Sequence, residues 1–415
     1  EHIMRISTMQ QFNSGVRSIL DNQKSTTTSQ QQISTGRKVL TPADDPIAST
    51  RILQLQQDIS LRNQYEKNVV AARNRQNLEE AILTGVTENI SRIRELTVNA
   101  GNGSMTQEDR TSIAIEIDER YKALVDLMNT KDASNTYIFS GFKGETEPFQ
   151  SRPGGGVTYQ GDDGERSLGI SNSTRVQTND SGKKLFVDVE SAENSFFTED
   201  NAMNIGSGFI SNGFITDQAA YDSFYPEDMV IRFNPDAFIS PPGPNFNVIT
   251  RSENRPINGL IGVAFNPGTS IVVEGASFKL AGEPEPGDSF FVTSSKKQSL
   301  LDSVSGLVEG LRALGDAPAQ SAALDKLIET TLLNMDFAQN SVSEVRSEIG
   351  GRLNTIDNIE NLHADVDLVS QDILSQLQDV DFAEAVSRLS LQSFLLEASQ
   401  QSFTQISRLS LFNTL

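Results

Sequence analysis

The uneven distribution of proline is the feature that most limits what this chain can fold into. Of its 14 proline residues, 11 lie between Pro148 and Pro286, and none lies in 47–147 or 319–415. A proline inside a helix costs about 3 kcal/mol, so long helices are expected only in the two proline-free stretches. Glycine is divided in the same way, with 17 of 29 residues in 148–305. The sequence therefore predicts two helical end regions around a turn-rich β region.

This division predicts an α+β fold: a long, coiled-coil-like helical rod made from both chain termini, with a mostly antiparallel β domain inserted between them. Residues 1–3 precede the first methionine and are expected to be left over from expression. Five segments are expected to follow: an N-terminal assembly helix with a connecting spoke, one half of the rod, an outer β domain, the other half of the rod and a C-terminal assembly helix. Their predicted bounds are 4–46, 47–147, 148–295, 296–380 and 381–415.

The chain lacks most of the residues that catalytic and metal sites need. Its 415 residues include no Cys and only two His, one of which lies before Met4. Thiolate chemistry and disulfides are therefore excluded, and any catalytic triad would have to use His363. His363 is followed by Asp365 and Asp367, but residues at i, i+2 and i+4 do not share one helix face. We predict no catalytic residues, no metal, no cofactor and no small-molecule substrate.

Charge and hydropathy argue against two further kinds of partner. The formal net charge is −21, which argues against nucleic acid. No apolar run approaches the roughly 18 residues that span a bilayer, and the residues after Met4 lack the apolar stretch of a cleaved secretory signal, so no membrane contact is expected. Residues 1–150 carry a net charge of −2 and residues 296–415 carry −9. Pairing of these two regions, or simple solvation of helix faces, would explain that difference equally well.

The N-terminal region has the spacing of a helix that ends before a turn. Its apolar residues step by three or four: Met9, Phe12, Val16 and Ile19. Residues 21–32 are almost all polar and predict a poor helix in isolation. Gly36 suits the position after a helix end, Pro42 and Pro46 interrupt any helix, and Asp44 or Asp45 is expected to cap the next one.

The C-terminal region carries the longest regular apolar pattern. Between residues 342 and 380 the steps of three and four have a mean near 3.5, the period of a coiled coil. Gly350-Gly351 is a weak point within this helix. The predicted rod seam consists of Val345, Ile349, Leu353, Ile356, Ile359, Leu362, Val366, Val369, Ile373 and Leu377. After it, Asp379, Asp381 and Glu384 are interpreted as a helix cap and its acidic first turn rather than as an acid–base pair.

The middle region predicts short strands. Residues 157–170 contain two β-type runs around the turn sequence of 161–164. Alternating apolar residues predict further strands in KKLFVDV (183–189), MVIRF (229–233), FNVITR (246–251), SIVVEG (270–275) and FFVTS (290–294). Frequent Gly and Pro between them favour an antiparallel sandwich or barrel.

The outermost apolar stripes have no further core within the chain to join. A long helix with one apolar stripe cannot be stable alone, and the two rod halves already serve as partners for each other. We therefore expect the segments before Gly36 and after Phe382 to pack against other molecules. The alternative is a closed monomeric bundle.

Several motifs resemble bacterial flagellins and flagellin-like hook-associated proteins. ISTGRKVLTPADDPIAS (33–49) resembles their N-terminal signature, and 377–415 resembles their C-terminal signature. TYIFSGFKGETEPF (136–149) is narrower and resembles the members at the hook–filament junction, as do YQGDDGER (159–166) and LAGEPEPGDSFFV (280–292). The residues that carry the family motif are Gly36, Arg37, Pro42, Asp44, Asp45, Pro46, Phe139 and Gly141.

The resemblance implies a structural protein of the bacterial flagellum, secreted by the flagellar type III apparatus and located outside the cell at the hook–filament junction. Its implied partners are the first hook-associated protein, flagellin, neighbouring copies of itself in a ring, and a cytoplasmic export chaperone. The terminal segments would be disordered in the monomer and fold on assembly. The implied assembly interface comprises Met9, Phe12, Val16, Ile19, Phe394, Leu395, Phe403, Ile406, Leu409, Leu411 and Phe412.

Two other functions fit parts of the sequence. The first is a flagellin or minor flagellin that polymerises by itself. The second, from another class, is a secreted adhesin or enzyme with its site in the β domain, although residues 150–295 contain no His and no Cys.

Overall fold

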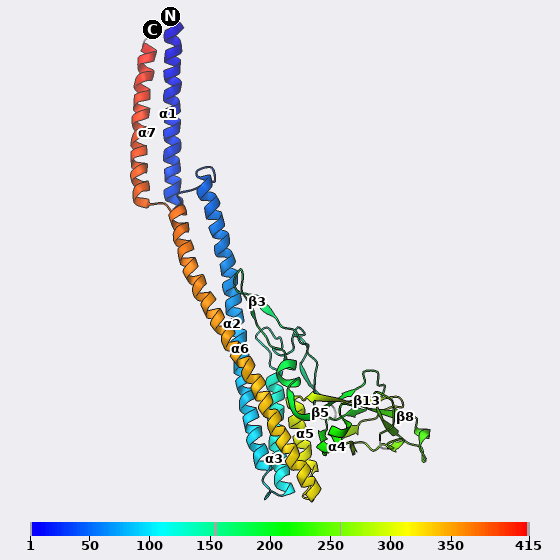
Figure 1. Ribbon diagram of the computed structural model, residues 1–415. Coiled ribbons are helices and arrows are strands. Elements are labelled where there is room, and N and C mark those ends of the chain that lie inside the picture. Colours follow the sequence, from blue (N-terminus) through cyan, green and yellow to red (C-terminus); the bar gives the residue numbers. More distant parts are fainter. Residues whose placement is uncertain (1, 153–155, 258, 413–415) are drawn as a thin grey trace. The chain divides into compact units, whose positions relative to one another are not determined.

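The computed structural model describes residues 2–152, 156–257 and 259–412, and the side chains of 2–9, 11 and 406–412 lie outside the described part. Long helices at both ends of the chain flank a mostly antiparallel β domain in the sequence, which confirms the predicted α+β class (Figure 1). The chain divides into two units, one formed by 1–67 with 358–415 and the other by 68–357.

Seven α-helices are formed by the described residues. They are α1 (His2–Thr35), α2 (Pro46–Ala100), α3 (Gln107–Met128), α4 (Gln218–Phe224), α5 (Leu300–Ala313), α6 (Pro318–Gln378) and α7 (Phe382–Phe412). The starts of these helices follow from local chemistry. Asp45 accepts the Ile47 and Ala48 N–H groups at the start of α2, and Thr106 forms a capping box with Asp109 at the start of α3.

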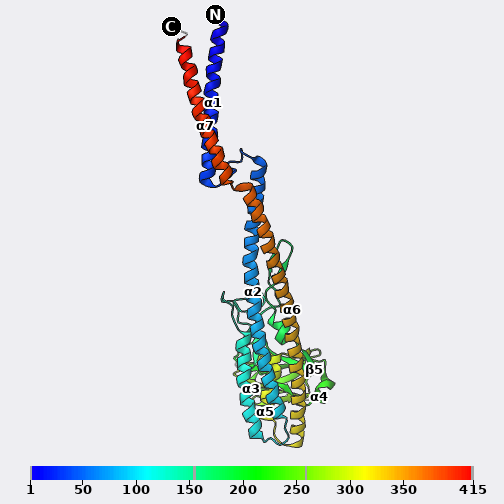
Figure 2. The ribbon, with the colours of Figure 1, turned by 90° about the vertical axis from the view of Figure 1, so that its left-hand side faces the viewer.

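The first unit contains α1, α7 and the adjoining parts of α2 and α6. In both views α1 and α7 run side by side (Figures 1 and 2). The polar stretch 21–32 is helical here, and Ser29 within it is buried. The residues of this stretch have low helix propensity, and its helix packs against α7.

The second unit has a helical core shared by α2, α3, α5 and α6. Its largest fully buried aliphatic side chains include Leu83, Ile90, Ile93, Ile117 and Leu124. The three-residue strands β1 (Phe149–Ser151) and β2 (Val157–Tyr159) pair antiparallel beside it, and Phe149 and Val157 join this core. Strands β3 (Ser167–Gly169) and β4 (Arg175–Gln177) form a second small antiparallel pair.

The larger β region has a separate core built around Tyr221, Phe246, Phe278 and Phe290. A five-stranded antiparallel sheet has the order β10-β9-β8-β13-β5, and a smaller sheet has the order β11-β12-β6 with β7 also on β12. The strands are β5 (Glu190–Asp200), β6 (Phe209–Ile210), β7 (Phe214–Ile215), β8 (Met229–Asn234), β9 (Asn245–Thr250), β10 (Val263–Ala264), β11 (Ser270–Val273), β12 (Ala276–Ala281) and β13 (Ser289–Lys297). A short 3-10 helix, η2, covers Asp236–Phe238.

One prediction for the middle region is wrong in detail. KKLFVDV is not a strand but contains the π-helix η1 (Lys183–Val187), whose Leu185 and Phe186 are buried in the helical core. The two β-type runs on either side of 161–164 form as predicted, and each pairs with another strand, β2 with β1 and β3 with β4.

Candidate assembly surface

The α1–α7 pair is held by a few specific contacts along one line. The rings of Phe12 and Phe403 lie 5.0 Å apart between centroids, at 50°. Gly15 leaves room for this contact, since a Cβ there would lie 3.0 Å from the Phe403 ring. Further along, the Asn22 side-chain amide donates to the Ser399 hydroxyl at 2.8 Å. The facing surfaces are therefore mixed, with an aromatic contact at one end and polar contacts toward the other.

Helix α7 carries apolar side chains on two faces, and α1 covers only one of them. Leu389, Leu396 and Phe403 recur every seven residues and are half-buried. Phe394 is 65% exposed, and Leu391 and Leu395 are also exposed. Exposed apolar patches are a common feature of interaction surfaces, which makes this face of α7 a candidate for one.

The predicted assembly residues are only partly brought together. Phe12 contacts Phe403, and Val16 and Ile19 are half-buried on α1. Phe394 and Leu395 are exposed and lie on the uncovered face of α7. The side chains of Met9, Ile406, Leu409, Leu411 and Phe412 lie outside the described part of the structure.

The turn after α1 is tied to the end of α6 by main-chain hydrogen bonds. The Val380 N–H donates to the Gly36 carbonyl at 3.0 Å, and the Lys38 N–H donates to the Gln378 carbonyl at 2.7 Å. Arg37 and Asp379 form a β-bridge between these bonds. Gly36 adopts φ +70°, a left-handed conformation that favours glycine. The motif residues Gly36 and Arg37 thus join the segments that lead to the two terminal helices.

The two aspartates of the motif, Asp44 and Asp45, stabilise different parts of the backbone. Asp44 accepts the N–H groups of Thr41 at 2.7 Å and Leu40 at 3.2 Å, and hydrogen bonds from Thr41 lower the pKa of this carboxyl. Asp45 caps α2, with Pro46 as its first residue and Pro42 in the preceding loop. At the start of α7, Asp381 accepts from the N–H groups of residues 383 and 384, the cap predicted for it.

The predicted rod seam divides into a covered and an uncovered part. In the second unit, Val345, Ile349 and Ile356 are buried. In the first unit Leu362 is 52% exposed, Val369 is 55% exposed, and Val366 is exposed as well. The remaining members, Leu353, Ile359, Ile373 and Leu377, are half-buried.

A change of helix face accounts for the uncovered part. A stripe with a 3.5-residue period drifts by about 20° per heptad around a helix with 3.6 residues per turn. In this stretch of the first unit, α2 meets polar residues of α6 instead: Arg62 pairs with Asp367 and donates to the Ser370 hydroxyl at 2.8 Å. Leu362, Val366 and Val369 consequently face away from α2.

The motif residues Phe139 and Gly141 anchor the loop after α3. Phe139 is buried, with its ring 5.3 Å from Phe186 in an edge arrangement. Gly141 adopts φ +69°, and a Cβ there would collide with Asp162. Asp162 in turn accepts the Phe142 N–H at 2.7 Å. This part of the motif therefore fixes a loop in the second unit.

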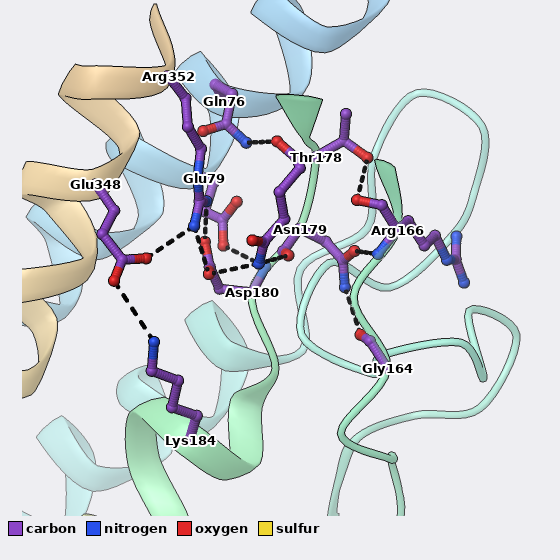
Figure 3. Close-up of polar contacts among 11 residues, drawn as sticks. Gln76, Glu79, Gly164, Arg166, Thr178, Asn179, Asp180, Lys184, Glu348 and Arg352 are labelled. Carbon is purple, nitrogen blue, oxygen red and sulfur yellow. Dashed lines mark hydrogen bonds and ion pairs between the residues drawn. The ribbon is translucent and has the colours of Figure 1, made fainter. Parts of the chain in front are cut away.

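A buried polar cluster between α2 and α6 of the second unit was not predicted from the sequence (Figure 3). Asp180 is fully buried, and Arg352 donates to its two oxygens at 2.5 and 3.1 Å. The Asp180 N–H donates to the Glu79 carboxyl at 3.1 Å, and Glu348 accepts from Arg352 at 2.8 Å. The sequence contained one indication of this cluster. Gln76 and Glu79 continue the three- and four-residue spacing of the buried Leu83 and Val86, which places these polar side chains on the buried face of the helix.

Glu79 is the electrostatically unusual member of this cluster. Burial, followed by the nearby Asp180 carboxylate, raises the pKa of Glu79 well above its ordinary value. Its second oxygen has no hydrogen-bond partner in the structure. Burial therefore favours the protonated form of Glu79, and the cluster locks two helices and a loop together.

The alternative of a site in the β domain has one cavity in its favour. A cavity of about 400 Å³ lies beside β5, β7, α5 and α6 in the second unit, and Lys326 lines it. Lys326 donates to Glu193 at 2.9 Å, and this hydrogen bond raises the pKa of the lysine. A lysine nucleophile needs the opposite shift, so Lys326 is not activated as a nucleophile. Among the described residues there is no group of three metal-ligating side chains and no helix apolar enough to cross a membrane.

Family models match both ends of the chain. Residues 6–143 match the bacterial flagellin N-terminal helical region, and residues 332–415 match the bacterial flagellin C-terminal helical region. Together these matches cover more than half of the chain.

Individual relatives are similar over greater lengths. Flagellar hook-associated protein 3 of Escherichia coli (strain K12) is 26% identical over 409 residues, which is 99% of each chain. The crystal structure of flagellar hook associated protein-3 from Legionella pneumophila is 27% identical, with a TM-score of 0.53, and the match covers 79% of this chain and 98% of that one. The crystal structure of the flagellar junction protein FlgL from Legionella pneumophila is also 27% identical, with a TM-score of 0.50. That match covers 79% of this chain and 100% of the other.

Proposed function

The chain belongs to the bacterial flagellin family, and from that premise we propose that it joins the flagellar hook to the filament. The support is the similarity, over 99% of both chains, to a relative named flagellar hook-associated protein 3, and the likeness to a solved flagellar junction protein. The chain is then a structural component of the flagellum, not an enzyme, and is secreted to the cell exterior.

The observation that carries this proposal is the uncovered apolar face of α7. Leu391, Phe394 and Leu395 are exposed although α1 already packs on the helix. We propose that these residues, with Phe12, Phe403 and the terminal positions predicted beside them, fold against neighbouring subunits during assembly. The first hook-associated protein, flagellin and further copies of this chain are the neighbours, and an export chaperone covers the C-terminal region in the cytoplasm.

The domain assignment follows the same proposal. Segments 4–46 and 381–415 serve assembly, 47–147 and 296–380 form the rod, and 148–295 form the outer β domain. The terminal segments are disordered in the free monomer and become helical on assembly, as α1 and α7 are here.

A substitution on the uncovered face tests the proposal without touching a core. Phe394→Asp, in a strain that lacks its own copy of the gene, is expected to leave the exported chain folded but to abolish attached filaments and motility. The matched control is Phe238→Asp, which makes the same change at a residue that is 53% exposed in the β region, against 65% for Phe394. Normal motility with Phe394→Asp contradicts the proposal.

Polymerisation of the purified chain separates the junction role from the flagellin alternative. Flagellin-type function requires the chain to form long filaments by itself, whereas a junction protein is expected to stop at short assemblies. Long filaments from the pure chain would favour the alternative.

A further inference from the structure

Helix α1 carries a basic edge on a surface that α7 does not cover. Leu20 is 57% exposed, Arg17 precedes it by three residues and Lys24 follows it by four, so the three share one helix face. The contacts with α7 use other positions, such as Phe12 and Asn22. Within the described residues neither Arg17 nor Lys24 forms a salt bridge, although Lys24 lies near enough to Asp44 to help lower the pKa of that carboxyl, and the exposed Asp21 shares their helix face.

The uncovered stripe of α6 has an acidic edge. Asp365 follows Leu362 by three residues and precedes Val369 by four, and Asp372 follows Val369 by three. Both aspartates are exposed, and neither has an ion pair in the described part of the chain. The surrounding stretch 353–387 contains eight Asp and Glu residues and no Lys or Arg. A partner with basic side chains is therefore favoured here.

The two edges match in spacing as well as in charge. Arg17 and Lys24 are seven residues apart, as are Asp365 and Asp372. At 1.5 Å per residue this separates each pair by about 10.5 Å along its helix. Each edge also borders exposed aliphatic side chains, Leu20 on α1 and Val366 with Val369 on α6.

We propose that α1 of one copy packs on the Leu362–Val369 stripe of α6 in a second copy, with Arg17 and Lys24 paired to Asp365 and Asp372. The inference rests on the proposed function and names one contact of the assembly. Leu20 on α1 and the Leu362–Val369 stripe on α6 are exposed within a single chain, and a second copy can cover each with the other. Because the two surfaces differ, the contact is heterologous and repeats from copy to copy, as a ring or helix requires. Exposed ion pairs add little affinity, so the charges set the register and the aliphatic residues supply the adhesion.

The absence of native cysteine allows a direct test by disulfide trapping. Full-length Leu20→Cys and Val366→Cys chains with different epitope tags are expressed together in cells that lack the native gene, and their isolated flagella are mildly oxidised. We expect a disulfide-linked dimer that carries both tags, with a yield about tenfold or more above that of the controls. The controls replace one partner by Ser25→Cys or Leu368→Cys, which are exposed on other faces of the same helices.

The outcomes separate this inference from the function on which it rests. Flagella that contain both chains but give no excess of the mixed dimer over the controls overturn the inference and leave the junction role intact. If the chains are absent from isolated flagella, both proposals fail.

Charge reversal gives a second, independent readout. Arg17→Glu with Lys24→Glu, and Asp365→Lys with Asp372→Lys, are each expected to reduce the number of attached filaments. A chain that carries all four changes is expected to recover attachment. Unreduced attachment in either reversed chain, or no recovery in the combination, contradicts the pairing.

Discussion

Glu79 shows how one buried side chain links the second unit to pH. Its carboxyl is fully buried beside Asp180, and its raised pKa means that the folded chain binds this proton more tightly than the unfolded chain does. The contribution of this tighter proton binding to the free energy of unfolding is complete below the pKa of the unfolded chain, near 4.5. It is lost as the pH rises through the higher pKa of the folded chain. Between those two values each pH unit costs up to about 1.4 kcal/mol.

Replacement of Glu79 by Gln should remove this dependence. The amide has nearly the same shape, and its oxygen can still accept the Asp180 N–H. We expect thermal unfolding to occur at a higher temperature than in the unchanged chain at pH 8, with a smaller difference at pH 5. The control is Glu88→Gln on the exposed side of α2. A Glu79→Gln variant with the same pH profile as the unchanged chain would show that Glu79 is ionised when buried.

Gly141 illustrates a motif residue whose role is conformational. An alanine at this position would have to adopt the left-handed backbone conformation, which costs about 1–2 kcal/mol, and its Cβ would also displace Asp162. We expect Gly141→Ala to lower the free energy of unfolding by at least about 2 kcal/mol in chemical denaturation. Gly103→Ala is the matched control, because nothing lies within 4 Å of a Cβ at that turn. Equal free energies of unfolding for the two variants would contradict this explanation.

Residues differed in how far the sequence could predict their roles. Asp45, Asp381 and the Thr106–Asp109 box were predictable because capping depends on a few neighbouring residues. The Glu79–Asp180–Arg352 cluster was not, because its members are 101 and 172 residues apart and their pairing depends on how the helices pack. Local patterns carry no information on such distant partners.

At the scale of elements, helices with long periodic patterns were predictable and short irregular segments were not. Apart from the proline at which each begins, helices α2 and α6 lie within the proline-free stretches. The strands with alternating apolar residues formed at β8, β9, β11 and β13. The π-helix η1 was missed because Phe186 is drawn into the aromatic contacts with Phe139 and Phe149, and tertiary packing overrides β-propensity there. The seam of α6 was predictable as a stripe, but its period alone did not tell which part another helix covers.

The glycine pair in α6 provides a prediction at this scale. Gly350 and Gly351 lie inside a continuous helix, and a Cβ at either position would meet no atom within 4 Å. Alanine at both should therefore stabilise the second unit by about 0.5–1 kcal/mol for each residue. The contrasting variant is Gly306→Ala in α5, where a Cβ would lie 3.2 Å from the Gly213 carbonyl and from the Phe214 Cβ, and a loss of stability is expected.

Denaturant unfolding of both variants checks this prediction. The double alanine variant should unfold at higher denaturant concentration and Gly306→Ala at lower. If the double variant is less stable than the unchanged chain, then α6 requires a bend at these glycines that the structure does not contain.

At the scale of the whole molecule, the two units differ in how much of their stability lies within one chain. The second unit has two hydrophobic cores, and the helical one draws its members from residues 82–349. The first unit joins α1 and α7 through contacts that include the hydrogen bond of Asn22 with Ser399 and the buried Ser29. Isolated helices with little apolar burial are marginal in water. Stability should therefore reside in the second unit of the free chain.

Truncation at both ends tests this division. A chain of residues 37–382 lacks both α1 and nearly all of α7 but keeps every member of the two cores. We expect it to remain a soluble monomer with one cooperative thermal transition, and to lose self-association because the exposed face with Phe394 is gone. In the full-length monomer, hydrogen exchange should be fast in α1 and α7 and slow in the core helices of 68–357. Loss of the cooperative transition on truncation, or slow exchange throughout α1 and α7 of the free monomer, would mean that the terminal helices are stable before any neighbour arrives, and assembly would then have to proceed by docking of finished surfaces instead of by coupled folding.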